Sequence, residues 1–93
     1  MENDIDQLIR LRVKKLSLNI REIRTNKGYK QDYMAAKLLI SQNAYSKMEL
    51  GRSSLTIARL FQIGQILEMD IFDIINYQSP AITNTLHLSD KVA

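Results

Sequence analysis

Apolar residues recur at intervals of three and four along the first quarter of the chain, which is the spacing of one helix face. These residues are Ile5, Leu8, Ile9, Val13, Leu16, Ile20 and Ile23. No Gly or Pro interrupts the run, and Gly28 follows as a helix stop. We therefore expect a first helix that ends near Asn26. Whether it begins near Asp4 or near Leu16 stays open, because the charged residues 10–15 could contain a break.

Two short helices are expected next, separated by only three residues. The first covers Gln31–Leu38 and the second covers Gln42–Glu49. Ser41 suits the start of the second helix, because its hydroxyl can accept from a free backbone N–H, and Gly51 is placed to end it. The inward residues of the first of these two helices are expected to be Met34, Ala35 and Leu38.

A broad apolar face predicts a fourth helix, and Thr56 is placed to cap it. The apolar residues of this helix are Ile57, Leu60, Phe61, Ile63, Ile66 and Leu67. Asp70, followed by Asp73, resembles an acidic capping box for a short fifth helix over residues 71–76. The residues of the fifth helix available for burial are Phe72, Ile74 and Ile75. Five helices without an obvious sheet predict an all-α fold.

The chain changes character at its C-terminal end. Residues 78–80 form a breaker, and residues 81–88 alternate weakly between apolar and polar side chains. Residues 77–93 are therefore expected to be a tail that is flexible, that adds a strand, or that orders on a partner. The chain then divides into an N-terminal helical extension (1–15), a central domain (16–76) and this tail.

Composition limits the classes of protein that the chain could belong to. Hydrophobic residues make up 45% of the 93 residues, enough for one compact core. No stretch approaches the roughly 18 apolar residues of a membrane span, and the start of the chain is acidic, so we expect a cytoplasmic protein with no membrane partner. Without cysteine, and with His87 as its one histidine, the chain offers no ordinary zinc cage, and no cofactor is expected.

The positive charge is concentrated in the middle of the chain, although the net charge is only +3. Residues 1–15 carry four basic and three acidic residues, residues 16–52 carry seven and three, and residues 53–93 carry two and four. The three segments therefore contribute +1, +4 and −2. A polyanion is the natural partner of the middle segment, although a basic surface can also serve solubility alone.

The sequence offers no recognisable catalytic arrangement. The serines lack a histidine base and the carboxylates do not pair, so catalysis is not expected.

The helix expected at Gln42–Glu49 has a polar side suited to the DNA major groove. At about 100° per residue, its polar residues fall on one arc of about 140°. They are Gln42, Asn43, Ser46 and Lys47, whereas Ala44, Tyr45 and Met48 face the other way. An amide side chain fits the N6/N7 edge of adenine, and lysine fits guanine or a phosphate. The alternative interpretation of this arc is an ordinary solvated face.

Phosphate contacts are predicted at the ends of these helices. Lys30 and Gln31 lie at the start of the earlier helix, where free N–H groups and the helix dipole favour an anion. Arg52 follows the later helix and is expected to act in the same way. Contacts of this kind set the register of a protein on DNA and do not read sequence.

Several ordered motifs of the chain resemble the Cro/repressor-type (XRE-like) helix-turn-helix family. They occupy residues 20–24, 27–31, 41–52 and 70–75, and the resemblance covers about residues 16–76. It implies a five-helix, lambda-repressor-like domain that binds double-stranded DNA as a dimer on a palindromic operator and regulates transcription. It also implies a bacterial or phage origin, with the protein on the nucleoid when bound.

The resemblance also assigns roles to individual residues. Gln31 is expected to contact DNA from the earlier helix. The residues expected at the groove or its phosphates are Ser41, Gln42, Asn43, Ser46 and Lys47. Arg24 and Glu49 are expected to form a partly buried ion pair between the first and third helices. The chain departs from the family pattern at three positions: Leu39 replaces a glycine of the turn, Lys30 replaces a Ser/Thr cap, and Tyr45 replaces a smaller branched residue.

Two binding functions compete on this sequence. The first is a dimeric repressor or controller protein, whose dimer surface would come from residues 5–13, from the fourth and fifth helices, or from the tail. The second is an antitoxin-like or other protein-interaction module, in which residues 77–93 order on a protein ligand and DNA binding is secondary.

Overall fold

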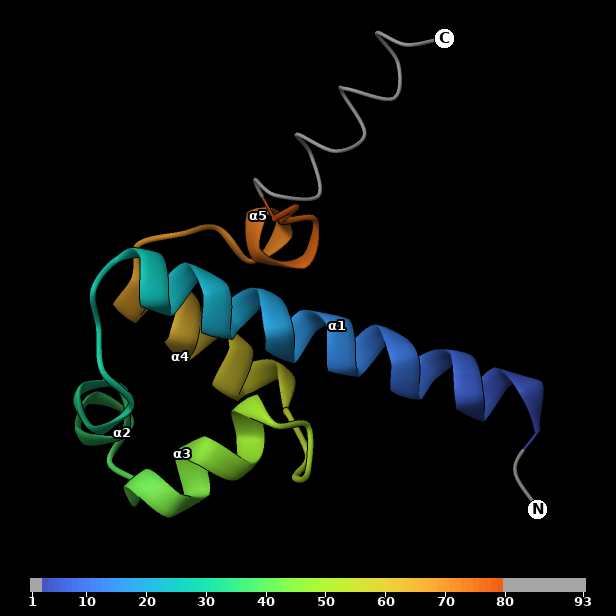
Figure 1. The fold of residues 1–93 in the computed structure, drawn as a ribbon, viewed down its shortest axis with the longest axis horizontal. Helices are drawn as coiled ribbons and strands as arrows, with labels where there is room; N and C mark the ends of the chain where they lie inside the picture. The colour runs from blue at the N-terminus through green and yellow to red at the C-terminus, as the bar shows by residue number, and fades with distance from the viewer. Residues whose placement is uncertain (1–2, 80–93) are drawn as a thin grey trace, which may run out of the picture.

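The computed structural model describes residues 3–79, and every regular element in this range is a helix (Figure 1). The helices are α1 (Asp4–Asn26), α2 (Gln31–Leu38), α3 (Gln42–Glu49), α4 (Ile57–Leu67) and α5 (Ile71–Ile75). The predicted five-helix, all-α fold is confirmed. Residues 80–93, on which the alternative protein-partner role depends and which include His87, lie outside the described residues.

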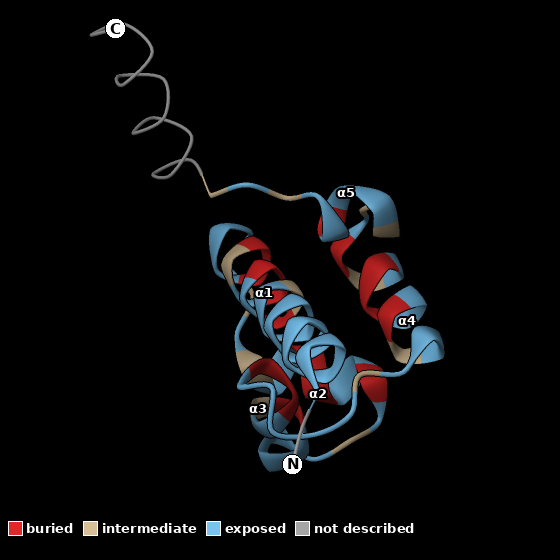
Figure 2. Ribbon diagram, turned by 90° about the vertical axis from the view of Figure 1, so that its right-hand side faces the viewer, coloured by how far each residue is buried: buried red, intermediate tan, exposed pale blue. Residues whose placement is uncertain are grey.

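The first helix is continuous from its acidic start, with no break in the charged residues 10–15. The Asn3 side chain accepts a hydrogen bond from the Asp6 backbone N–H over 2.8 Å and so caps the helix. Gly28 follows the other end with φ of +78°, the left-handed conformation that suits glycine. Residues 4–15 are exposed and extend beyond the rest of the helical domain (Figures 1 and 2).

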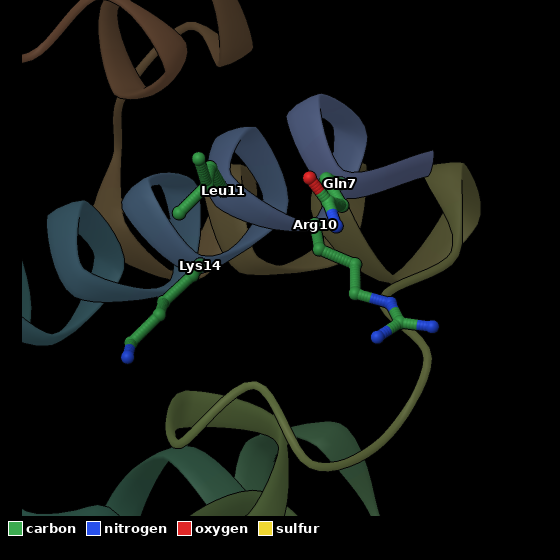
Figure 3. A pocket seen from close by; sticks show the side chains of 4 residues that line it. All are labelled: Gln7, Arg10, Leu11 and Lys14. Atoms are coloured by element: carbon green, nitrogen blue, oxygen red, sulfur yellow. The ribbon is translucent and has the colours of Figure 1, made fainter. Parts of the chain in front are cut away.

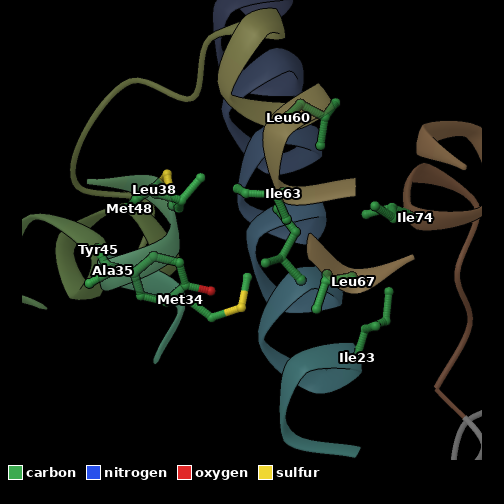
Figure 4. Close-up of a cluster of buried hydrophobic side chains, with 11 residues drawn as sticks. Ile23, Met34, Ala35, Leu38, Tyr45, Met48, Leu60, Ile63, Leu67 and Ile74 are labelled. Carbon is green, nitrogen blue, oxygen red and sulfur yellow. The ribbon is translucent and has the colours of Figure 1, made fainter. Parts of the chain in front are cut away.

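All five helices contribute to one apolar core (Figure 4). The fully or nearly fully buried members are Ile20, Ile23, Met34, Ala35, Leu38, Tyr45, Met48, Leu60, Ile63, Leu67 and Ile74. The three predicted inward residues of α2 are among them. The apolar pattern overestimated burial elsewhere, because Phe72 and Ile75 of α5 are exposed, as are Ile57 and Phe61 of α4. A helix of five residues presents few positions to the core: in α5 Ile74 is fully buried and Ile71 packs at the core's edge.

The apolar face of α1 is continuous in sequence, but only its second half is buried. Ile20 and Ile23 lie in the core, and Leu16 packs at its edge. Ile5 and Ile9 are 70% and 52% exposed, because no other described helix reaches the start of α1. Helical spacing therefore predicted the helix correctly, while the apolar residues of its first half stay exposed.

Polar side chains attach α5 and the residues after it to α1. The buried Asn19 side chain donates to the Ile74 carbonyl over 3.0 Å and accepts from Lys15 Nζ over 2.8 Å. Asn26 Nδ2 donates to the Tyr77 hydroxyl over 3.1 Å. Ser79 Oγ lies 2.7 Å from Glu22 Oε1 and donates to it. Residues 77–79 therefore pack along α1, three residues past the predicted domain boundary at residue 76.

Candidate nucleic-acid interface

A tight turn sets the angle between α2 and α3, and Leu39 holds its left-handed position. Leu39 has φ of 60° and ψ of 40°, and its side chain is 91% exposed. The Ile40 N–H donates to the Ala35 carbonyl over 3.0 Å and closes α2. A left-handed leucine costs on the order of 1–2 kcal/mol. The turn therefore keeps the conformation expected of the family's glycine, although a leucine occupies the position.

Ser41 starts α3, and two buried side chains fix this helix to the domain. The Ser41 hydroxyl accepts from the Ala44 N–H over 3.0 Å, as an N-cap does. Tyr45 and Met48 are buried in the core and point toward the side chains of α2, including Met34 (Figure 4). Because these anchors are fully packed, the opposite side of α3 is held rigidly toward solvent.

An ion pair joins α1 to α3 beneath this exposed side. Arg24 Nε lies 2.6 Å from Glu49 Oε2, and Arg24 Nη2 lies 3.1 Å from Glu49 Oε1. The Glu49 side chain is only 2% exposed. Arg24 Nη1 also donates to the Tyr29 carbonyl over 2.7 Å, so the guanidinium holds the α1–α2 loop as well. Burial lowers the pKa of Arg24, but the Glu49 carboxylate more than offsets this, and the net pKa is raised.

Glu49 is the centre of a larger network than the sequence predicted. The Tyr45 hydroxyl donates to Glu49 Oε2, and Gln31 Nε2 donates to Glu49 Oε1 over 3.2 Å. Burial and the neighbouring carboxylate raise the pKa of Tyr45, so the hydroxyl stays protonated and remains a donor. Gln31 is the first residue of α2, and its half-buried side chain is hydrogen-bonded to Glu49. The spacing of four residues between Tyr45 and Glu49 was the sequence signal for this contact.

The side of α3 away from the core presents the predicted base-contact residues. Gln42, Asn43 and Lys47 are exposed, and Ser46 is half-buried. Ala44 is exposed as well, so the prediction that it faces inward was wrong. The first turn of a helix can project past the helices that support it, and its residues are then exposed on every side. The place of Ala44 in the first turn of α3 therefore explains its exposure, which angular spacing alone does not predict.

The predicted phosphate-contact residues lie at the ends of α2 and α3. Lys30 is the N-cap residue of α2, is exposed, and makes no side-chain capping hydrogen bond. The Ser41 hydroxyl accepts from the backbone, which leaves its own O–H available as a donor. Arg52 is exposed just after α3, and its N–H donates to the Lys47 carbonyl over 2.9 Å. In sequence, Lys30 and Ser41 therefore precede α3, and Arg52 follows it.

Within residues 3–79, no three His, Cys, Asp or Glu side chains come together in a way that could hold a metal ion. None of the helices formed by these residues is both long and apolar enough to cross a membrane.

Comparison with known families matches the region that contains this interface. The family model described as Helix-turn-helix matches residues 20–74, more than half of the chain. The match runs from the second half of α1 into α5, and so includes α2, the turn and α3. A search of curated proteins found no match to the chain.

Proposed function

Since the chain belongs to the XRE-type helix-turn-helix family and is a DNA-binding transcriptional regulator, we propose that it acts as a dimeric repressor or controller protein on a palindromic operator. One observation carries the proposal: α3 is anchored by the buried Tyr45 and Met48, while its amide and lysine side chains face solvent. A helix held in this way can enter a major groove about 12 Å wide without losing its fixed orientation.

In the proposed complex, the exposed side of α3 reads base edges. Gln42 and Asn43 each pair a donor and an acceptor with adenine, and Lys47 reaches guanine or a phosphate. Ser46 contributes a short donor or acceptor from the same side. The methyl group of Ala44, exposed beside Asn43, suits contact with the methyl group of thymine.

Contacts with the phosphate backbone of the DNA then set the position of the domain on the duplex. We assign them to Lys30, Gln31, Ser41 and Arg52, which supply positive charge or hydrogen-bond donors at the ends of α2 and α3. In a dimer on a palindromic operator, the two α3 helices would lie about 34 Å apart, so that they enter successive major grooves.

The proposal is tested by selecting a preferred operator from random duplex DNA and measuring its affinity for variants of α3. Gln42→Ala and Asn43→Ala should each lose about 1–3 kcal/mol on the selected operator and little on random duplex DNA. Gln65→Ala removes an exposed amide from α4 and should leave both affinities unchanged. Equal losses on both DNAs for the α3 variants would contradict base readout by these side chains.

A further inference from the structure

We propose that residues 4–15 of α1, called the α1 extension below, form the docking surface for a second copy of this chain, with the two helices antiparallel. The proposal deepens the dimeric function above and rests on it for the need for a dimer. The surface itself is argued from exposure, grooves and charge within the described residues, none of which involves the DNA-binding side of α3.

The α1 extension is a specified helix whose apolar side is uncovered. Asn3 caps its start, and every one of its residues is exposed. Ile5, Leu8, Ile9 and Val13 are exposed apolar residues at helical spacing. The extension continues from the packed second half of α1, so the folded domain already supplies the nucleus of this helix, but its apolar residues stay exposed. A partner that covers these residues would bury them and stabilise the extension.

The surface continues from the α1 extension onto the domain itself. Ile9 and Val13 line an open groove that ends at Leu50 and Gly51, just after α3. The same two residues line a second open groove on the other side of α1, which reaches Ile75. Leu50 and Ile75 are both exposed. A second helix lying on Ile9 and Val13 would therefore bury apolar residues from three parts of the domain.

Charge along the α1 extension favours a second copy in the antiparallel direction. Its first turn is acidic, with Asp4 and Asp6, whereas its second half carries four basic residues. They are Arg10, Arg12, Lys14 and Lys15. Figure 3 shows Arg10 and Lys14 leaving α1 on the side away from Leu11. Antiparallel copies place the acidic end of one helix beside the basic end of the other, whereas parallel copies place like charges together.

The spacing of the apolar residues fits a two-fold axis at one position. Ile5 and Val13 lie four residues before and four residues after Ile9. In an antiparallel pair centred on Ile9, this residue faces its own copy, and Ile5 of each chain faces Val13 of the other. The contact is then self-complementary, as a closed dimer requires.

The oligomeric state of the full chain without DNA gives the first test. By sedimentation velocity we expect a dimer, and Ile9→Glu should raise its dissociation constant at least roughly 100-fold, because two carboxylates would meet at the axis. Phe72→Glu, at an exposed position of α5, should leave the dimer intact. Circular dichroism checks that both variants remain helical. Dissociation by Phe72→Glu but not by Ile9→Glu would place the interface on α5 and overturn the proposal.

Disulfide trapping gives the orientation, since the natural chain contains no cysteine. Ile9→Cys should form a covalent dimer on mild oxidation. Ile5→Cys and Val13→Cys should cross-link when mixed, but neither should cross-link efficiently alone. Self-linking by each of the latter two variants would indicate parallel helices, and no cross-linking by any of the three would exclude the surface. Either result overturns the proposal.

Failure here can be told apart from failure of the proposed function. If the chain binds an operator as a dimer and Ile9→Glu changes neither stoichiometry nor affinity, the interface is wrong and the DNA function stands. If Ile9→Glu produces monomers but the natural dimer binds no duplex DNA, the interface stands and the DNA function fails.

Discussion

Replacing Arg24 with alanine is expected to lower the free energy of unfolding by about 3–5 kcal/mol, the cost of leaving one member of a buried ion pair without its partner. The Glu49 carboxylate is almost fully buried and receives two charge-assisted hydrogen bonds from the guanidinium. Tyr45 and Gln31 would remain as donors, but neither supplies a positive charge. Urea unfolding followed by circular dichroism measures the effect.

A matched control separates the ion pair from a general effect of removing charge. Arg21 lies three residues earlier on α1, is exposed, and should tolerate alanine with little change in stability. If Arg24→Ala lost less than about 1 kcal/mol, the pair would behave like an exposed salt bridge and would not be the link between α1 and α3. Any loss of DNA binding in Arg24→Ala should disappear under conditions where the variant is fully folded.

DNA affinity is expected to fall roughly 10²–10³-fold when the salt concentration rises from about 50 mM to about 200 mM. We base this range on four to six charged phosphate contacts in a dimer, contributed on each chain by Lys30, Arg52 and, where it reaches a phosphate, Lys47. Each contact releases a condensed counterion, so the logarithm of affinity falls linearly with the logarithm of salt concentration. Fluorescence anisotropy of a labelled duplex over a salt series gives the slope.

Neutralising one predicted contact should change that slope by a fixed amount. Lys30→Gln or Arg52→Gln removes two contacts from a dimer and should flatten the slope by about two. Arg21→Gln removes the same charge from α1, beside Thr25 and Ser79, and should leave the slope unchanged. Equal flattening by all three variants would mean that the slope reports overall charge and that the positions of the phosphate contacts are wrong.

Helix boundaries in this chain could be predicted because their signals are local. Ser41, Thr56 and Asp70 were expected at the starts of three helices, and each accepts a backbone hydrogen bond there. Gly51 takes the left-handed conformation just after α3, as expected of a glycine in that place. Capping depends on a few neighbouring residues and on no distant contact, so the sequence carries it directly.

Burial was predicted correctly only where a second element covers the apolar side. Ile20 and Ile5 occupy equivalent positions in the apolar pattern of α1, yet one is in the core and the other is exposed. The exposure of Ala44 and the contact from Gln31 to Glu49 likewise depend on how α3 sits against its neighbours. Periodicity gives the direction of a side chain around a helix but not what lies opposite it.

The most direct test of the central claim, that the exposed side of α3 meets duplex DNA, is a map of backbone amide chemical shifts by NMR during titration with a selected operator. The largest changes should fall at Gln42, Asn43 and Lys47 and at the start of α2, while amides of α5 around Phe72 change little. Changes confined to α5 or to residues 4–15, with the amides of α3 unmoved at saturation, would contradict the account.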